Sequence, residues 1–285
     1  MIDVSGLSRT IASMSLTGAK RELVGATTAV VFASLLVDGP AAWLVAVCLL
    51  MAVAFATLQI LADAIPSAAS LGVPVESLIV PGITSLGLVG AIRLVPTGLL
   101  LIPALALGAW LLARVLGTEA RLLASPSGPS SADRTAVVGQ ALVVGFLAFA
   151  GVAALVPGGI PGRGDSTVAS TGPAGAALAL LATADAAIAF LLGYRAAALR
   201  TPMLRSVVWF ALTSAIVVAI AAAALRAMEI PRLLGPALLV VVFFLWDAMH
   251  AAPLTRRRDA RWIWEAVLLA VLAIAVVAWS LRLGR

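Results

Sequence analysis

The chain alternates between long apolar runs and short polar connectors over almost all of its 285 residues. Most runs are about 16 to 22 residues long, close to the roughly 20 residues that cross a bilayer as a helix. Backbone polar groups inside lipid must be paired within a helix or a closed barrel, and the runs lack the strict alternation of barrel strands. The pattern therefore predicts an all-α, polytopic transmembrane helix bundle. Its helices are expected at 23–37, 41–62, 77–92, 97–113, 136–156, 174–194, 206–225, 233–252 and 262–281.

The run at 77–92 is the least regular of these nine predicted spans. It is short, and it contains Pro81 followed by Gly82, two residues that interrupt helices. We predict about nine spans, or eight if this segment is re-entrant. The longest aqueous connector is expected at about 114–135.

The first 22 residues are polar, and we predict that they form a cytoplasmic N-terminal segment. Residues 23–285 are predicted to form one transmembrane helical domain, with no room for a separate soluble domain. A cleaved signal peptide is the alternative interpretation of 23–37, because basic residues precede this run and the small residues Gly39 and Ala41 follow it.

Composition supports the same class of protein, because apolar residues make up 62% of the chain and charged residues only 11%. The 19 Lys and Arg give a formal net charge of +6, but they form no patch with interleaved aromatics, so no nucleic-acid partner is expected. Cations instead mark the cytoplasmic connectors of membrane proteins. We therefore predict a multi-pass protein of the plasma membrane, with the lipid bilayer as its partner.

The cations divide unequally between the two sides when nine spans are assumed and the N-terminus lies inside. The cytoplasmic connectors then carry Arg9, Lys20, Arg21, Arg114, Arg121, Arg134, Arg195, Arg200, Arg205, Arg256, Arg257, Arg258 and Arg261. The outer segments carry Arg93, Arg163, Arg226, Arg232, Arg282 and Arg285. This bias predicts an inside N-terminus and an outside C-terminus.

Asp185 is the candidate for a functional group inside the membrane, since it lies near the middle of the predicted span 174–194. An ionised carboxylate there is costly, so the group should be protonated, paired or in contact with water. Thr213 and Ser214, at a comparable depth on the next span, are expected hydrogen-bond partners. Asp185 is either a proton or cation relay or a neutral carboxyl that joins two helices.

A second group of ionisable residues is expected at the cytoplasmic face. Its members are Asp247, His250, Glu265, Arg256, Arg257 and Arg258. The cluster either binds an anionic lipid head group or solute, or is a salt-bridged helix end that fixes orientation. His250 is the only histidine, and no zinc-binding motif surrounds it, so neither a metal nor another cofactor is predicted.

Three classes of function remain open. The first is permease-like transport of a small solute or ion through Asp185. The second is a non-catalytic membrane subunit or scaffold, in a homo- or hetero-oligomer that close contacts between small residues such as Gly87 and Ala91 would allow. The third is an enzyme acting on a lipid-linked substrate at the cytoplasmic cluster. Missing nucleophile-elbow and P-loop motifs lower the expectation of an enzyme, and no catalytic residue is predicted.

The C-terminal third of the chain contains a span that closes in Tyr194-Arg195, another that opens at Leu204-Arg205-Ser206, and an Arg-rich turn after Trp246. In these features it resembles small uncharacterised polytopic membrane proteins of high-GC bacteria. The resemblance implies a helical membrane fold, and it transfers no activity and no functional residue.

Overall fold

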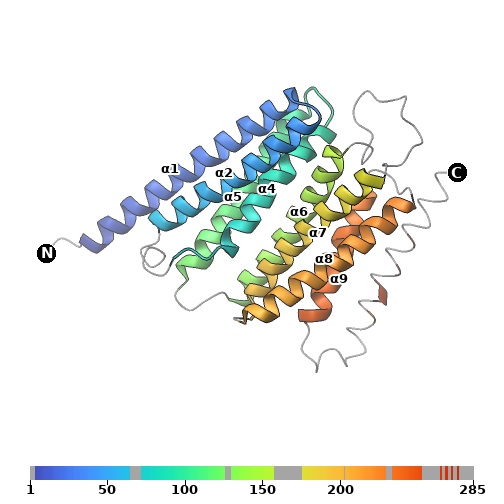
Figure 1. Cartoon of the computed structure of the whole chain (residues 1–285). Coiled ribbons are helices and arrows are strands. Elements are labelled where there is room, and N and C mark those ends of the chain that lie inside the picture. Colours follow the sequence, from blue (N-terminus) through green and yellow to red (C-terminus); the bar gives the residue numbers. More distant parts are fainter. Residues whose placement is uncertain are drawn as a thin grey trace. The chain divides into compact units, whose positions relative to one another are not determined.

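The computed structural model describes residues 4–64, 72–125, 130–156, 175–201, 203–228 and 233–251, and five isolated positions after them. The described residues form helices and contain no β-strand (Figure 1). The helices are α1 (Val4–Ala33), η1 (Ser34–Leu36), α2 (Pro40–Ala64), α4 (Glu76–Ala91), η2 (Ile92–Leu94), α5 (Leu101–Ala124), α6 (Ser131–Leu155), α7 (Gly175–Ala198), α8 (Leu204–Ala227) and α9 (Leu234–Ala251).

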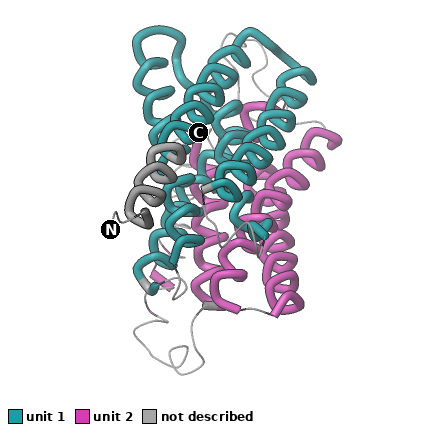
Figure 2. Tube along the Cα trace, turned by 90° about the vertical axis from the view of Figure 1, so that its left-hand side faces the viewer, with its two compact units in different colours: residues 1–151 teal, residues 152–285 magenta. Residues whose placement is uncertain are grey.

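The chain divides into two compact units, which are coloured separately in Figure 2. Unit 1 is Met1–Gly151 and contains α1, α2, α4, α5 and most of α6. Unit 2 is Val152–Arg285 and contains α7, α8 and α9. In unit 1, α4 packs against α1, α2 and α5, whereas in unit 2 α8 packs against both α7 and α9.

Six helices of the described part are long and apolar enough to cross a membrane. They are Pro40–Asp63, Glu76–Leu94, Leu101–Ala124, Ala132–Leu155, Gly175–Ala198 and Leu204–Ala227. The segment Leu234–His250 is apolar but shorter. The membrane helical bundle is therefore supported, whereas the count of nine spans is not confirmed. The predicted span 262–281 lies outside the described ranges.

Large apolar side chains are exposed on several of these helices. Leu44 and Phe55 on α2 and Trp209 and Ile220 on α8 all expose more than half of their surface. Such surfaces are costly in water but are the normal lipid-facing surfaces of a membrane protein. Burial and exposure thus agree with an integral membrane protein of the helical class.

The helix α4 is the centre of unit 1, since residues 80–90 are all buried. It continues through Pro81 without a break, so the predicted interruption at Pro81 and Gly82 is wrong. Pro81 lies in the second turn of α4, and a proline inside a membrane helix is tolerated where neighbouring helices and local adjustments satisfy the backbone group that it frees. The 19-residue stretch Glu76–Leu94 is long and apolar enough to span a membrane.

Glycines bring α4 and α6 into backbone contact. A Cβ atom added at Gly87 would lie 2.9 Å from the backbone nitrogen of Ala148. One added at Gly90 would overlap the backbone of Gly151. Only residues without bulky side chains permit such an approach, and close van der Waals packing is what joins helices inside a membrane.

The helix α5 continues to Ala124, so the predicted aqueous connector at 114–135 is wrong. The helix extends this far because its buried apolar face continues through Val115, Leu116 and Ala120. The helix α6 then begins at Ser131. The helix α6 begins five residues before the predicted start at 136. Ser130 and Asp133 cap it reciprocally: the Ser130 backbone N–H donates to the Asp133 carboxylate, and the Asp133 N–H donates to the Ser130 hydroxyl, both at 3.1 Å.

Arg93 in η2 joins two parts of unit 1 that are far apart in the sequence. Its guanidinium donates to the backbone carbonyls of Ser34 in η1 and of Val37 directly after η1. It also forms an ion pair with Asp38 at 3.2 Å. Arg93, which the cation distribution places in an outer segment, therefore also links η2 to the carbonyl groups at the end of η1.

Candidate functional site

The helices α7 and α8 form the hairpin that carries Asp185. Gly193 on α7 makes this packing possible, since an added Cβ atom would lie 2.6 Å from the Ser214 hydroxyl oxygen on α8. The Ser214 hydroxyl lies 3.1 Å from the Ala189 carbonyl oxygen, which fixes the relative position of the two helices. Asp185 lies on α7 one helical turn before Ala189, farther from the loop that joins α7 to α8.

The Asp185 side chain is buried inside unit 2, and the residue exposes only 1% of its surface. Neither carboxylate oxygen has a hydrogen-bond partner among the described residues. Buried polar groups are normally hydrogen-bonded, and an unsatisfied group within a membrane span is a candidate for function. Burial thus agrees with the position that the sequence predicted.

The predicted hydrogen bonds to Asp185 are not formed, so this part of the prediction is wrong. The Thr213 hydroxyl donates to the Phe210 carbonyl at 2.9 Å. The Ser214 hydroxyl donates to the backbone carbonyls of Ala189 and Ala211. Hydroxyl groups in helices readily bond to the carbonyl of the preceding turn, and the sequence alone does not show which acceptor they choose.

Arg226, in the last turn of α8, is a cation in the same hairpin as Asp185. Sequence reasoning assigned Arg226 to an outer connector and did not connect it to Asp185. A long arginine side chain can extend along its helix while its charged group stays at a different level from its Cα atom. The hairpin of α7 and α8 therefore contains both an acid, Asp185, and a cation, Arg226.

The cluster that the sequence predicts around Asp247 and His250 has a different centre in the structure. Asp247 on α9 forms an ion pair with Arg200, whose Nη2 lies 2.5 Å from Oδ2. Arg200 follows the end of α7, and its guanidinium carbon lies 6.0 Å from the centre of the Phe210 ring. The sequence placed Arg200 inside but did not include it in the cluster.

His250 lies on the same face of α9 as Asp247, as predicted, but it contacts aromatic rings. Its ring centre lies 4.4 Å from that of Trp246 and 5.4 Å from that of Phe210. Its Nδ1 is 3.0 Å from the Trp246 carbonyl oxygen, which accepts the hydrogen bond. Asp247 Oδ1 and Trp246 Nε1 are buried and lack partners within the described part of the chain.

The remaining residues of the predicted cluster, Arg256, Arg257, Arg258 and Glu265, lie outside the described residues. Within the described ranges, no group of three His, Cys, Asp or Glu side chains is arranged to hold a metal ion. The described core of the cluster is therefore one ion pair, Arg200–Asp247, next to an aromatic contact of His250.

A third polar region in unit 1 was missed by the sequence reasoning. Thr118 on α5 accepts hydrogen bonds from Gln140 on α6, at 2.8 Å, and from Arg121. The neighbouring Glu119 exposes only 2% of its surface. Burial, and secondarily the Arg121 charge, lowers the pKa of Lys20 on α1. The sequence does not indicate a buried polar region at Thr118 and Glu119, because its pattern predicts an aqueous connector over 114–135.

Comparison with known proteins does not extend this description. No protein family model matches the chain, and no curated protein and no solved structure is similar to it. The helices nevertheless define the class, which is an integral membrane protein built as a helical bundle. A particular function has to be argued from the sites, since a fold alone does not imply one.

Proposed function

We propose that the protein is a permease-like membrane protein that moves a small solute or ion, with Asp185 as the group that binds a proton or cation. One observation carries the proposal: both oxygens of Asp185 are buried without a hydrogen-bond partner in the described part of the chain. A charged side chain in the middle of a span costs at least about 2.5–3.5 kcal/mol. A bound proton or cation would remove this cost.

The surroundings of Asp185 support two states of the carboxyl group. Arg226, in the last turn of α8 in the same hairpin, carries a positive charge, and a cation near a carboxyl group favours its ionised state. Burial in the α7–α8 hairpin favours the neutral state, because little solvent stabilises the charge there. A group held between these opposing effects can take up and release a proton or cation during a transport cycle.

Asp185→Asn tests the proposal, because the amide keeps the size of the side chain and removes its charge. The chain would be purified into liposomes that contain the pH-sensitive dye pyranine, and proton movement would be followed with alkali cations and small amines as candidate solutes. We expect solute-dependent proton movement in the native chain and its loss in Asp185→Asn, with equal incorporation. Asp133→Asn, at the capped start of α6, is the matched control and should behave as the native chain.

Equal proton movement in the native chain and in Asp185→Asn would exclude the proposed role of Asp185. A second candidate function is a non-catalytic membrane subunit, favoured by ion pairs that join helix ends, such as Arg93–Asp38 and Arg200–Asp247. In that case Asp185→Asn changes abundance in the membrane or has little effect, and no solute evokes proton movement.

A further inference from the structure

The surroundings of Asp185 on its own helix are apolar. Residues three and four positions apart share one face of a helix, and around Asp185 these are Leu181, Ala182, Ile188 and Ala189. None of them has an oxygen or nitrogen atom in its side chain. Within one turn on this face of α7, the Asp185 carboxyl group is therefore the single polar side chain.

The facing part of α8 is equally apolar. The hydrogen bond from the Ser214 hydroxyl to the Ala189 carbonyl fixes which levels of the two helices meet. Because the helices of a hairpin run in opposite directions, one turn before Ala189 lies level with one turn after Ser214. This register brings Val218 level with Asp185. Val218 and the next residue of the same face, Ala222, are both buried.

Two continuous helices that share one carboxyl group do not provide the ligands of a metal ion. Ca²⁺ and Mg²⁺ take about six or more oxygen ligands. Transporters coordinate Na⁺ with the free carbonyl groups of broken helices, whereas α7 and α8 are helical throughout Gly175–Ala198 and Leu204–Ala227. Asp185 exposes only 1% of its surface, so a hydrated ion has no surface to approach. A proton needs one oxygen atom and almost no space.

The charges near Asp185 also disfavour a second cation. Arg226 follows Val218 by two turns of α8, about 12 Å along the helix axis, and it repels any cation that enters the site. The remaining titratable side chains of α7, α8 and α9 lie on the other side of Asp185, towards the loop that joins α7 to α8, or on α9 near Phe210; they are Tyr194, Arg195, Arg205, Asp247 and His250. No second acid of these helices is therefore placed to share a metal ion with Asp185.

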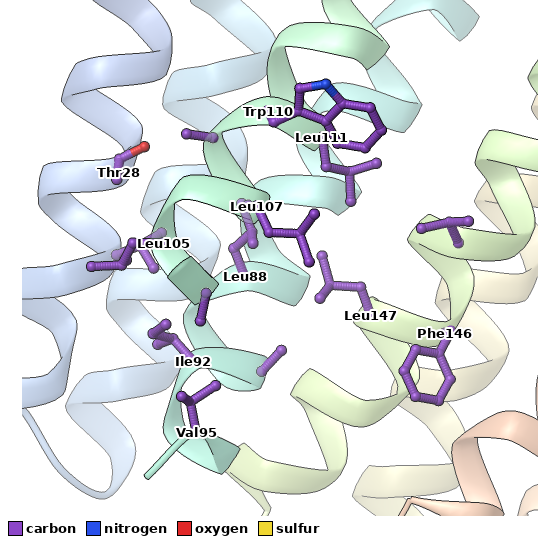
Figure 3. Close-up of a pocket in the computed structure, with 16 residues that line it drawn as sticks. Thr28, Leu88, Ile92, Val95, Leu105, Leu107, Trp110, Leu111, Phe146 and Leu147 are labelled. Atoms are coloured by element: carbon purple, nitrogen blue, oxygen red, sulfur yellow. The ribbon is translucent and has the colours of Figure 1, made fainter. Parts of the chain in front are cut away.

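The pocket of unit 1 does not offer another site for a cation. Figure 3 shows its lining, in which Leu107 of α5 and Leu147 of α6 face one another. None of the lining residues carries a charge. The Thr28 hydroxyl in this lining donates to the Val24 carbonyl at 2.7 Å. A cation would exchange its hydration shell for hydrocarbon here, which is strongly unfavourable.

We infer that the species bound at Asp185 is a proton and not a larger cation. The inference rests on the proposed function, in which Asp185 binds a proton or cation, and it selects between the two. Proton binding converts the buried carboxylate into a neutral acid, which removes the cost of a charge inside the hairpin. Release returns the proton to water and restores the ionised carboxylate, which Arg226 favours. Transport by this protein is then coupled to protons.

Infrared difference spectroscopy tests the inference, because a protonated carboxyl group has a C=O stretching band that a carboxylate lacks. Spectra of the full chain in liposomes are recorded between low and high pH. We expect a band of a buried, protonated carboxyl group that disappears as the pH rises and that is lost in Asp185→Asn. Its amplitude at constant pH should not change when Na⁺ or K⁺ replaces a bulky organic cation, or when Mg²⁺ or Ca²⁺ is added.

Asp133→Asn is the matched control, since it removes an acid outside the hairpin and should keep the band. If Asp185→Asn does not reach the membrane, Asp185→Glu keeps a carboxyl group and should shift the frequency of the band. A band that survives in Asp185→Asn, or that keeps its frequency in Asp185→Glu, belongs to another acid and overturns the inference. A band that weakens as a metal cation is added shows competition for the carboxylate and also overturns it.

The spectra do not depend on transport, so the two proposals can fail separately. An Asp185 band in a chain that shows no solute-dependent proton movement supports proton binding and contradicts the permease. Asp185-dependent movement of a solute without an Asp185 band supports the permease and overturns the inference, because the bound species is then not a proton.

Discussion

Two buried acids in unit 2 differ in what surrounds them. Asp247 has a direct partner, since Arg200 holds one of its oxygens at 2.5 Å. Neither oxygen of Asp185 has a hydrogen-bond partner among the described residues. The ion pair with Arg200 is enough to explain why Asp247 is present at the end of α9. Asp185 has no such explanation, so it is the better candidate for binding a proton or cation.

The Arg200–Asp247 pair leads to a prediction about stability. Arg200→Ala should lower the free energy of unfolding more than Asp247→Ala, because it leaves a carboxylate buried without its partner. Asp247→Ala leaves Arg200, whose side chain is 27% exposed and partly solvated. We expect a cost of about 2 kcal/mol for Arg200→Ala, between the values for exposed and buried pairs. Thermal unfolding in detergent measures both, and equal or reversed effects would show that the pair is not the cause.

Among the elements, α4 and α5 show how packing overrides local sequence signals. Pro81 predicts a break, but α4 continues through it, and Pro81 itself is buried among the neighbouring helices of unit 1. The charged residues after Arg114 predict a connector, but the apolar residues between them continue the buried face of α5. The sequence predicts that both segments are helices and where they lie approximately. It does not predict that α4 continues through Pro81 or that α5 extends to Ala124, because both depend on packing against neighbouring helices.

The contact between α4 and α6 should be intolerant of even one methyl group. Gly90→Ala would place a Cβ atom against the backbone of Gly151, which cannot move aside as a flexible side chain can. We expect a loss of about 1–3 kcal/mol in stability, typical of overpacking, and less monodisperse protein in size-exclusion chromatography. Gly139→Ala on α6 is the control, because nothing lies within 4 Å of its added Cβ atom. Its stability should be unchanged or slightly raised, since alanine favours helix.

At the scale of the whole molecule, the cation distribution predicts which connectors face the cytoplasm. A free cysteine, Cys48, is replaced by serine, and single cysteines are introduced as Thr97→Cys and Ser130→Cys. A membrane-impermeant maleimide should label Thr97→Cys in intact cells, and Ser130→Cys only after permeabilisation. Both positions are exposed, so accessibility to the reagent is decided by the membrane and not by burial. The reverse pattern would overturn the predicted orientation.

The sequence by itself determined the class of protein, because runs of apolar residues long enough to span lipid leave a helical bundle as the stable arrangement. The sequence also identified Asp185, because an acidic residue in the middle of a long apolar run is easy to recognise. Tertiary structure decided the partners: Arg200 for Asp247, and backbone carbonyls for Ser214 and Arg93. Such pairings join residues that are distant in the chain, and hydrophobic periodicity shows which face of a helix is buried but not which residue it meets there.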